Sequence, residues 1–192
     1  MGYNLKAILK KDSKNYQFIY YSLFKRLKCI LNADPISDQY YIWKYIVALR
    51  NCELALYNYK INKNGPIVKI FRICQLLYWK YKLRKLSYVT QFQIPPGVID
   101  SGLTIWHWGP IIINQKARIG KNVVLNPGVV IGHKDVNGGA PIIGNNVFIG
   151  AGSKIIGAIH IGDNVVIGQN VVIVKDIPDN AIIVSQKPRI IQ

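Results

Sequence analysis

The stretch APIIGNNVFIGAGSKIIGAIHIGDNVVIGQNVVIVKDIP, residues 140–178, repeats a pattern of six residues. Most units hold one large aliphatic residue followed by a glycine. Sampled every six positions from Ile113 to Ile173, the chain has Ile or Leu at ten of eleven places, and the exception is Asn137. An α-helix has a period of about 3.6 residues and a strand a period of about two, so neither explains this spacing. The pattern indicates a repeat structure.

A six-residue unit with one aliphatic residue and a Gly-rich corner is typical of a short strand followed by a turn. Three units close a triangular coil, and coils stacked about 4.8 Å apart cover one another's edges. We therefore expect a prism-shaped parallel β-helix. Ile131 and Ile143 are separated by two full repeat units, so the phase survives the irregular stretch HKDVNGGAP, residues 133–141. This stretch is predicted to be a protruding loop.

The composition changes near residue 90. The formal net charge of +16 divides into +13 for residues 1–90 and +3 for residues 91–192, and all Tyr and Cys lie in the first part. We expect a small α-helical domain over residues 1–90 and the β-helix domain over residues 91–192. The predicted helices cover roughly residues 15–31, 38–60 and 66–86.

The segment YWKYKLRKLSY, residues 78–88, interleaves aromatic and basic side chains. Such a segment suits peripheral contact with an anionic membrane surface or a polyanionic glycan, whereas nucleic acid is a remote option and is not expected as a partner. The alternative is a plain solvated helical face. The N-terminus lacks the apolar core of a signal peptide, and no uncharged run is suited to crossing a bilayer. Three cysteines without metal-ligand spacing favour a cytoplasmic location.

The repeats, with GLTIWHWG (residues 102–109) and VSQKPRII (residues 184–191), resemble the left-handed β-helix acyltransferases of the hexapeptide-repeat family. Within that family they are most similar to serine acetyltransferases and their capsule or lipopolysaccharide O-acetyltransferase relatives. The resemblance covers roughly residues 91–191. It implies a left-handed coil, a homotrimer that the N-terminal helices could pair into a dimer of trimers, and acetyl-CoA bound between neighbouring prisms.

His107 matches the catalytic histidine of an HxxG-like element in that family, although Pro110 stands in place of the glycine. Counting in sixes from Ile94 makes Trp106 inward and His107 outward, whereas counting back from Ile113 makes His107 inward. One extra residue must therefore lie between Ile94 and Ile113, as in the bulges that are common beside active sites. We favour the first count, in which Trp106 fills the core and His107 reaches the groove as a general base. The alternative is a structural histidine between aromatic rings.

The acceptor is less well specified. Serine acetyltransferases have an aspartate before the catalytic histidine, where this chain has Trp106, and an upstream aspartate and a second histidine that correspond here to Gln93 and Ala140. The exposed rings predicted for Trp106 and Trp108 suit stacking on a sugar. The main hypothesis is therefore O-acetylation of a sugar or surface polysaccharide; serine O-acetyltransferase and a catalytically silent scaffold are the alternatives.

The remaining candidates are assigned with their structural alternatives. Asp100 is the nearest carboxylate in sequence that could orient His107, and it could equally be a turn residue. His133 could contact acceptor or CoA, or could be a solvated loop residue. His160 is expected to face outward, and histidines so widely separated in sequence do not predict a metal site.

Acetyl-CoA is expected to lie along small residues that admit its pantetheine arm and near cations that pair with its phosphates. Corner geometry and ordinary surface charge are the alternative explanations. The candidates are Gly150, Ala151, Lys154, Gly157, Ala158, Gly168, Lys187 and Arg189.

Overall fold

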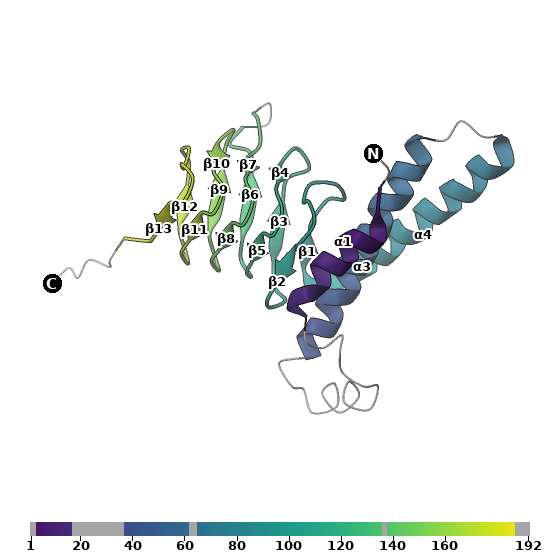
Figure 1. Cartoon of the computed structure of the whole chain (residues 1–192), viewed down its shortest axis with the longest axis horizontal. Coiled ribbons are helices and arrows are strands. Elements are labelled where there is room, and N and C mark those ends of the chain that lie inside the picture. The colour runs from purple at the N-terminus through teal and green to yellow at the C-terminus, as the bar shows by residue number, and fades with distance from the viewer. Residues whose placement is uncertain (1–2, 17–36, 62–64, 136–137, 187–192) are drawn as a thin grey trace.

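The structure is a computed structural model that describes residues 3–16, 37–61, 65–135 and 138–186. Helices occupy the N-terminal part and short strands the rest (Figure 1). The helices are α1 (Leu5–Asp12), the 3₁₀ helix η1 (Ser13–Asn15), α3 (Ser37–Lys60) and α4 (Pro66–Thr90). The strands are β1 (Phe92–Gln93), β2 (Thr104–Ile105), β3 (Ile111–Ile113), β4 (Arg118–Ile119), β5 (Val124–Leu125), β6 (Val130–Gly132), β7 (Ile142–Ile143), β8 (Phe148–Ile149), β9 (Lys154–Ile156), β10 (His160–Ile161), β11 (Val166–Ile167), β12 (Val172–Ile173) and β13 (Ile182–Ile183).

The strands form three sheets in which every pairing is parallel. Sheet A has the order β1-β3-β6-β9-β12, sheet B the order β4-β7-β10, and sheet C the order β2-β5-β8-β11-β13. Successive strands enter the three sheets in turn, so each coil has three sides. The predicted left-handed parallel β-helix, preceded by a small helical region, is confirmed.

The six-residue ladder forms the interior of the prism. Leu125 pairs with Ile149 and Ile131 with Ile155, so aliphatic residues stack on one another from coil to coil. The Ile and Leu residues of the ladder between Ile113 and Ile173 are each exposed by 4 % or less. Burial of these side chains supplies the main stabilisation of the prism.

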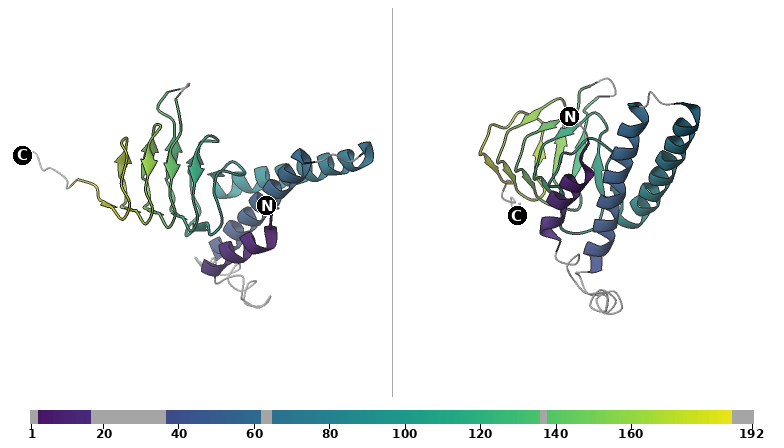
Figure 2. Two further views of the ribbon diagram at one scale, coloured as in Figure 1. Left: turned by 45° about the horizontal axis from the view of Figure 1, so that its top comes forward. Right: turned by 45° about the vertical axis from the view of Figure 1, so that its right-hand side comes forward.

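The loop between β6 and β7 confirms the prediction for residues 133–141 as far as they are described, and it projects from the prism in Figure 2. Ile119 pairs with Ile143, which in turn pairs with Ile161 in the next coil. The first of these coils contains the loop and is longer than the second by one whole repeat unit, so the chain returns in register. Asn137, the exception in the ladder, lies outside the described residues.

The first coil departs from both sequence counts. Gln93 pairs with Ile112, a separation that exceeds three repeat units by one and so confirms an extra residue in this turn of the chain. The inward residues, however, are Ile99, which bridges to Ile119, and Ile105, which pairs with Leu125. The prediction that Trp106 fills the core is wrong, because its side chain is 53 % exposed while Ile105 is fully buried. The step from Ile99 to Ile105 is regular, and a longer step to Ile113 follows.

Helices α3 and α4 begin within one residue of their predicted starts, and α4 ends later than predicted. α3 starts at Ser37 and ends at Lys60, and α4 starts at Pro66, a favoured first position, but continues to Thr90 rather than residue 86. The helix predicted over residues 15–31 lies almost wholly outside the described residues, and α1 was not predicted. β1 follows directly after α4, while the division into two domains at residue 90 stays a prediction.

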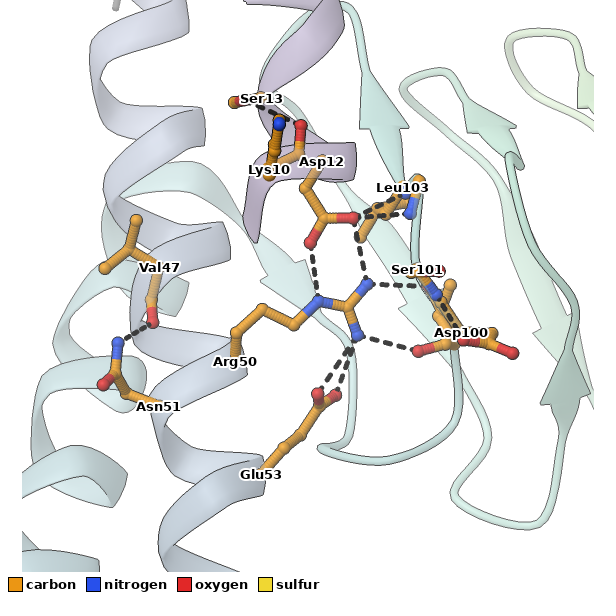
Figure 3. Close-up of polar contacts among 12 residues, drawn as sticks. Lys10, Asp12, Ser13, Val47, Arg50, Asn51, Glu53, Asp100, Ser101 and Leu103 are labelled. Carbon is orange, nitrogen blue, oxygen red and sulfur yellow. Dashed lines mark hydrogen bonds and ion pairs between the residues drawn. The ribbon is translucent and has the colours of Figure 1, made fainter. Parts of the chain in front are cut away.

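An ion cluster centred on Arg50 joins the helices to the first coil (Figure 3). The Arg50 guanidinium donates to the Asp12 carboxylate at 2.7 Å and to the Glu53 carboxylate at 3.1 Å. It also donates to the carbonyl oxygens of Ile99 and Asp100, at 2.8 and 2.7 Å. Because the Arg50 side chain is 1 % exposed, these partners replace the water that it loses.

Candidate active site

The corner that carries His107 lies in the long step between β2 and β3. After the buried Ile105, the side chains of Trp106, His107 and Trp108 are all exposed. Gly109 follows with φ of 135°, and its amide donates to the carbonyl oxygen of Thr90 at 3.2 Å. His107 points outward, as predicted. The inward residue before it, however, is Ile105 and not the Trp106 that the sequence count predicted.

The start of α3 and the residue after η1 lie against this corner. A pocket of about 250 Å³ is lined by Tyr16, Gln39, Ile105, Trp106 and His107. The buried Tyr16 hydroxyl accepts a hydrogen bond from the Ile105 amide at 2.7 Å. A phenol thus holds the backbone just before the candidate catalytic residue.

Two aromatic contacts hold the tryptophans on either side of His107. The Trp108 ring lies 5.8 Å from the Tyr41 ring, centroid to centroid, and the Trp106 ring lies 5.7 Å from the Phe148 ring in an edge contact. Both tryptophans keep a large exposed area, since Trp108 is 43 % exposed. They therefore flank His107 with accessible aromatic surface, which suits a sugar ring or another flat apolar group.

Asp38 is a functional candidate that the sequence did not reveal. It lies in the first turn of α3, beside the Gln39 that lines the pocket. Burial raises the pKa of the Asp38 carboxyl above its usual range, and the positive charge of His107 partly opposes that shift. The two side chains therefore interact electrostatically although they are far apart in sequence. A helix start was predicted at residue 38, but sequence alone does not place it against His107.

Asp100 occupies a different edge of the prism from His107. It follows Ile99, which bridges to sheet B, and precedes sheet C, whereas His107 follows sheet C. The Asp100 carboxylate accepts from the Ser101 amide at 2.6 Å, and its carbonyl oxygen accepts from Arg50. The structure therefore places Asp100 in the ion cluster and does not bring it to His107.

The candidate CoA residues fall on two edges of the prism. We call the C–A edge the line of corners that lead from sheet C to sheet A; it carries His107, then Gly150 and Ala151, then Gly168. Three strand spacings separate β2 from β11, which amounts to about 14 Å. The exposed Lys154 begins β9 beside this edge, and its ammonium donates to the Gly152 carbonyl oxygen at 3.0 Å.

The second group lies on the A–B edge, the line of corners that lead from sheet A to sheet B. Gly157 and Ala158 follow β9 there, and His133 follows β6 in the coil before. The Gly157 amide donates to the Gly132 carbonyl oxygen at 2.9 Å, and His133 Nδ1 contacts the Asn114 amide group. Within one chain, the structure does not bring this group to His107. Lys187 and Arg189 lie outside the described residues.

The packing of the corners is enough to explain at least one of these glycines, with no need for a bound CoA. A Cβ on Gly150 would lie 2.6 Å from the carbonyl carbon and oxygen of Gly168 in the next coil. His160 is exposed on β10, as expected of an outward repeat residue. Among the described residues, no three His, Cys, Asp or Glu side chains are grouped so that they could hold a metal ion.

Comparison with known proteins gives this site a family context. The family model "Bacterial transferase hexapeptide (six repeats)" matches residues 140–175. The putative colanic acid biosynthesis acetyltransferase WcaB of Escherichia coli K12 is 30 % identical over 163 residues, which cover 84 % of this chain and 88 % of that protein. The serine acetyltransferase of Mycobacterium tuberculosis is 37 % identical over 106 residues, or 54 % of this chain and 46 % of that protein.

The chain spans about half to two thirds of the length of the serine acetyltransferases that it matches in sequence. Solved structures agree on the fold. Soybean serine acetyltransferase superimposes with a TM-score of 0.65 at 23 % identity, covering 97 % of this chain and 69 % of that one. Brucella abortus serine acetyltransferase in complex with coenzyme A gives a TM-score of 0.61 at 26 % identity, covering 97 % and 66 %.

Proposed function

This chain belongs to the bacterial hexapeptide-repeat transferases, and from this premise we propose that it is an acetyl-CoA-dependent O-acetyltransferase acting on a sugar or surface polysaccharide. The observation that carries the acceptor class is the similarity to the colanic acid acetyltransferase, which extends over most of both chains. Similarity to the M. tuberculosis serine acetyltransferase covers only about half of each chain. The accessible tryptophans beside His107 support the same choice.

In the proposed reaction His107 is the general base. Its neutral imidazole accepts the proton of the acceptor hydroxyl as that oxygen attacks the thioester carbonyl of acetyl-CoA. The tetrahedral intermediate then collapses, the C–S bond breaks, and the imidazolium returns the proton to the CoA thiolate. The products are an acetyl ester and free CoA. A positioned base of this kind is worth about 10²- to 10⁴-fold in rate.

Asp38 is proposed as the residue that positions His107. A carboxylate close to a histidine stabilises the imidazolium that forms when the base accepts its proton. The pocket between the first turn of α3 and the His107 corner, together with the Tyr41–Trp108 contact, supports this role. Asp38 acts through His107 and does not itself touch the reacting atoms.

Serine O-acetyltransferase is kept as the second candidate because serine acetyltransferases are both sequence relatives and structural neighbours. Against it stand Gln93, Trp106 and Ala140, at the three positions where those enzymes have polar groups for a small amino acid. An amino-acid ammonium needs carboxylate partners. The described part of the corner offers aromatic rings at the rim instead.

A homotrimer is proposed because, within one chain, the candidate residues lie on two different edges of the prism. The C–A edge of one protomer, with His107, and the A–B edge of a neighbour, with His133, Gly157 and Ala158, would together form the acetyl-CoA groove. Exposed apolar side chains on the outer faces of sheets A and C support contact between prisms. They include Ile112 (41 % exposed), Val166 (40 %), Val172 (63 %) and Ile182 (74 %).

The CoA phosphates are proposed to bind Lys154 with Lys187 and Arg189, and Trp106, Trp108 and His133 to contact the acceptor. The N-terminal helices could join two trimers. For location we propose the cytoplasm, at the inner face of the membrane. No helix in the described ranges combines the length and the hydropathy that crossing a bilayer demands.

The test measures CoA thiol release from acetyl-CoA, with L-serine in one arm and capsule or O-antigen fractions in another. We expect release, and alkali-labile acetate on the glycan, only with the polysaccharide fractions. Turnover of L-serine alone would support the second candidate. No transfer to any acceptor by a well-folded trimer would favour the silent scaffold and overturn the proposal.

A further inference from the structure

Helix α4 has an apolar face that nothing in the described part of the chain covers. Its inner face packs against α3 and the prism through the buried Leu76, Leu83 and Thr90. On the opposite face, exposed apolar and aromatic side chains form two groups, within residues 67–71 and 77–81, and Tyr88 follows two helical turns later. We call them the outer α4 stripe: Ile67 (82 % exposed), Ile70 (62 %), Phe71 (68 %), Leu77 (59 %), Tyr78 (51 %), Tyr81 (58 %) and Tyr88 (71 %).

The stripe extends over nearly the whole helix. α4 has 25 residues, so at 1.5 Å per residue it is about 37 Å long. In Figure 2 the α3–α4 hairpin extends away from the prism, and the stripe side chains along it are exposed. A soluble surface rarely exposes so many large apolar side chains on one helix face without a partner.

The charges on α4 have one sign. Its basic residues are Lys69, Arg72, Lys80, Lys82, Arg84 and Lys85, and the helix contains no Asp or Glu. Three cations lie near stripe tyrosines: Lys82 Nζ is 5.6 Å from the centre of the Tyr78 ring, Lys85 Nζ is 5.2 Å from that of Tyr81, and Arg84 Cζ is 6.0 Å from that of Tyr88. Cations therefore border the aromatic part of the stripe.

We propose that the outer α4 stripe lies on the anionic leaflet of a lipid membrane, with its apolar side chains in the interface and its Lys and Arg side chains among the headgroups. Helices that lie in the plane of a membrane combine an apolar face, flanking cations and amphipathic aromatic residues in this way. The inference rests on the peripheral location proposed above, and it does not depend on the acetyl-transfer chemistry.

Charge argues for lipid over a second copy of the chain. Two α4 helices packed stripe to stripe would bring Lys82, Arg84 and Lys85 of one copy close to the same cations of the other, and neither helix has a carboxylate to pair with them. Anionic headgroups supply the missing counter-charge, and each Lys or Arg close to the surface adds to the attraction. An acidic polymer would match the cations but would leave the apolar side chains in water.

The position of α4 links such a surface to the candidate site. The helix runs from the tip of the hairpin back to the prism, where the Thr90 carbonyl oxygen accepts from the Gly109 amide at 3.2 Å. His107 therefore lies just beyond the membrane-facing helix.

The experiment is flotation of the purified full chain with vesicles of phosphatidylcholine alone or of phosphatidylcholine mixed with phosphatidylglycerol, which supplies anionic headgroups. We expect binding to the anionic vesicles, at least about ten-fold weaker binding to neutral ones, and weakening by salt. Phe71→Ser and the pair Lys82→Glu with Lys85→Glu should each reduce anionic binding at least about five-fold. The controls are Val184→Ser and Lys116→Glu, exposed apolar and charged sites on the prism.

Two results would overturn the inference. One is equal binding of the wild type to neutral and anionic vesicles, or to neither. The other is a fall in oligomeric mass in the Phe71→Ser variant without a change in vesicle binding, which would make a second copy the partner. Thiol release with a soluble acceptor, measured on the same variants, separates the membrane proposal from the acetyl-transfer proposal. We expect thiol release to be unchanged in these variants. A wild-type protein that binds vesicles but transfers no acetyl group would refute only the proposed chemistry.

Discussion

Replacing Arg50 with methionine should destabilise the protein severely, because it leaves two buried carboxylates without their cation. Asp12 is 1 % exposed and Glu53 is 8 % exposed, so neither regains much water. Removing one partner of a buried ion pair typically costs about 3–5 kcal/mol. The carboxylates keep other donors, namely the Gly102 and Leu103 amides for Asp12. We therefore expect a loss near the lower end, about 3 kcal/mol, in the free energy of unfolding.

Urea and thermal unfolding, followed by circular dichroism, measure this loss. The matched control is Arg84→Met, since Arg84 is exposed on α4 and its removal strands no buried charge; its effect should stay within about 0.5 kcal/mol. Combining Arg50→Met with Asp12→Asn and Glu53→Gln should recover part of the stability. A loss below about 1 kcal/mol for Arg50→Met would refute the view that this cluster anchors the helices to the prism.

Three further predictions concern titration, positioning and coil stacking. Burial raises the pKa of Tyr45 from 10.0 to about 12, so the stability it contributes is complete below pH 10 and lost as the pH rises towards 12; alkaline unfolding of Tyr45→Phe should be less steep. Removing the carboxylate with Asp38→Asn should lower kcat, because the imidazolium that forms on His107 during the reaction loses its neighbouring counter-charge, whereas Asp38→Glu should restore kcat. An unchanged kcat in Asp38→Asn would exclude the positioning role. Gly150→Ala should reduce the Tm, because its Cβ would lie 2.6 Å from the Gly168 carbonyl. An unchanged Tm would mean that the backbone at this corner can shift to admit a methyl group.

The regular coils could be predicted from sequence because one side chain in six carries the interior. The ladder from Ile113 to Ile173 follows from the hexapeptide period alone, and the loop after β6 follows from the preserved phase across it. These features are local, since each depends on a residue and its neighbours one coil away.

The first coil could not be predicted, because its geometry depends on the helices. The Ile111 amide donates to the Gln91 carbonyl oxygen, and the Tyr16 hydroxyl accepts from the Ile105 amide, so residues far apart in sequence set the phase there. A longer step results, and it makes Ile105 rather than Trp106 inward. For the same reason Asp38 was missed, whereas the outward position of His107 was predicted.

The central claim is that His107 removes the proton from the acceptor, and the most direct measurement is acetyl transfer by His107→Ala beside His160→Ala. Both histidines are exposed, so neither substitution should disturb the aliphatic ladder or the affinity for CoA. We expect transfer by His107→Ala to fall at least about 10²-fold and transfer by His160→Ala to stay close to wild type. Near-normal transfer by a folded His107→Ala protein would contradict the account.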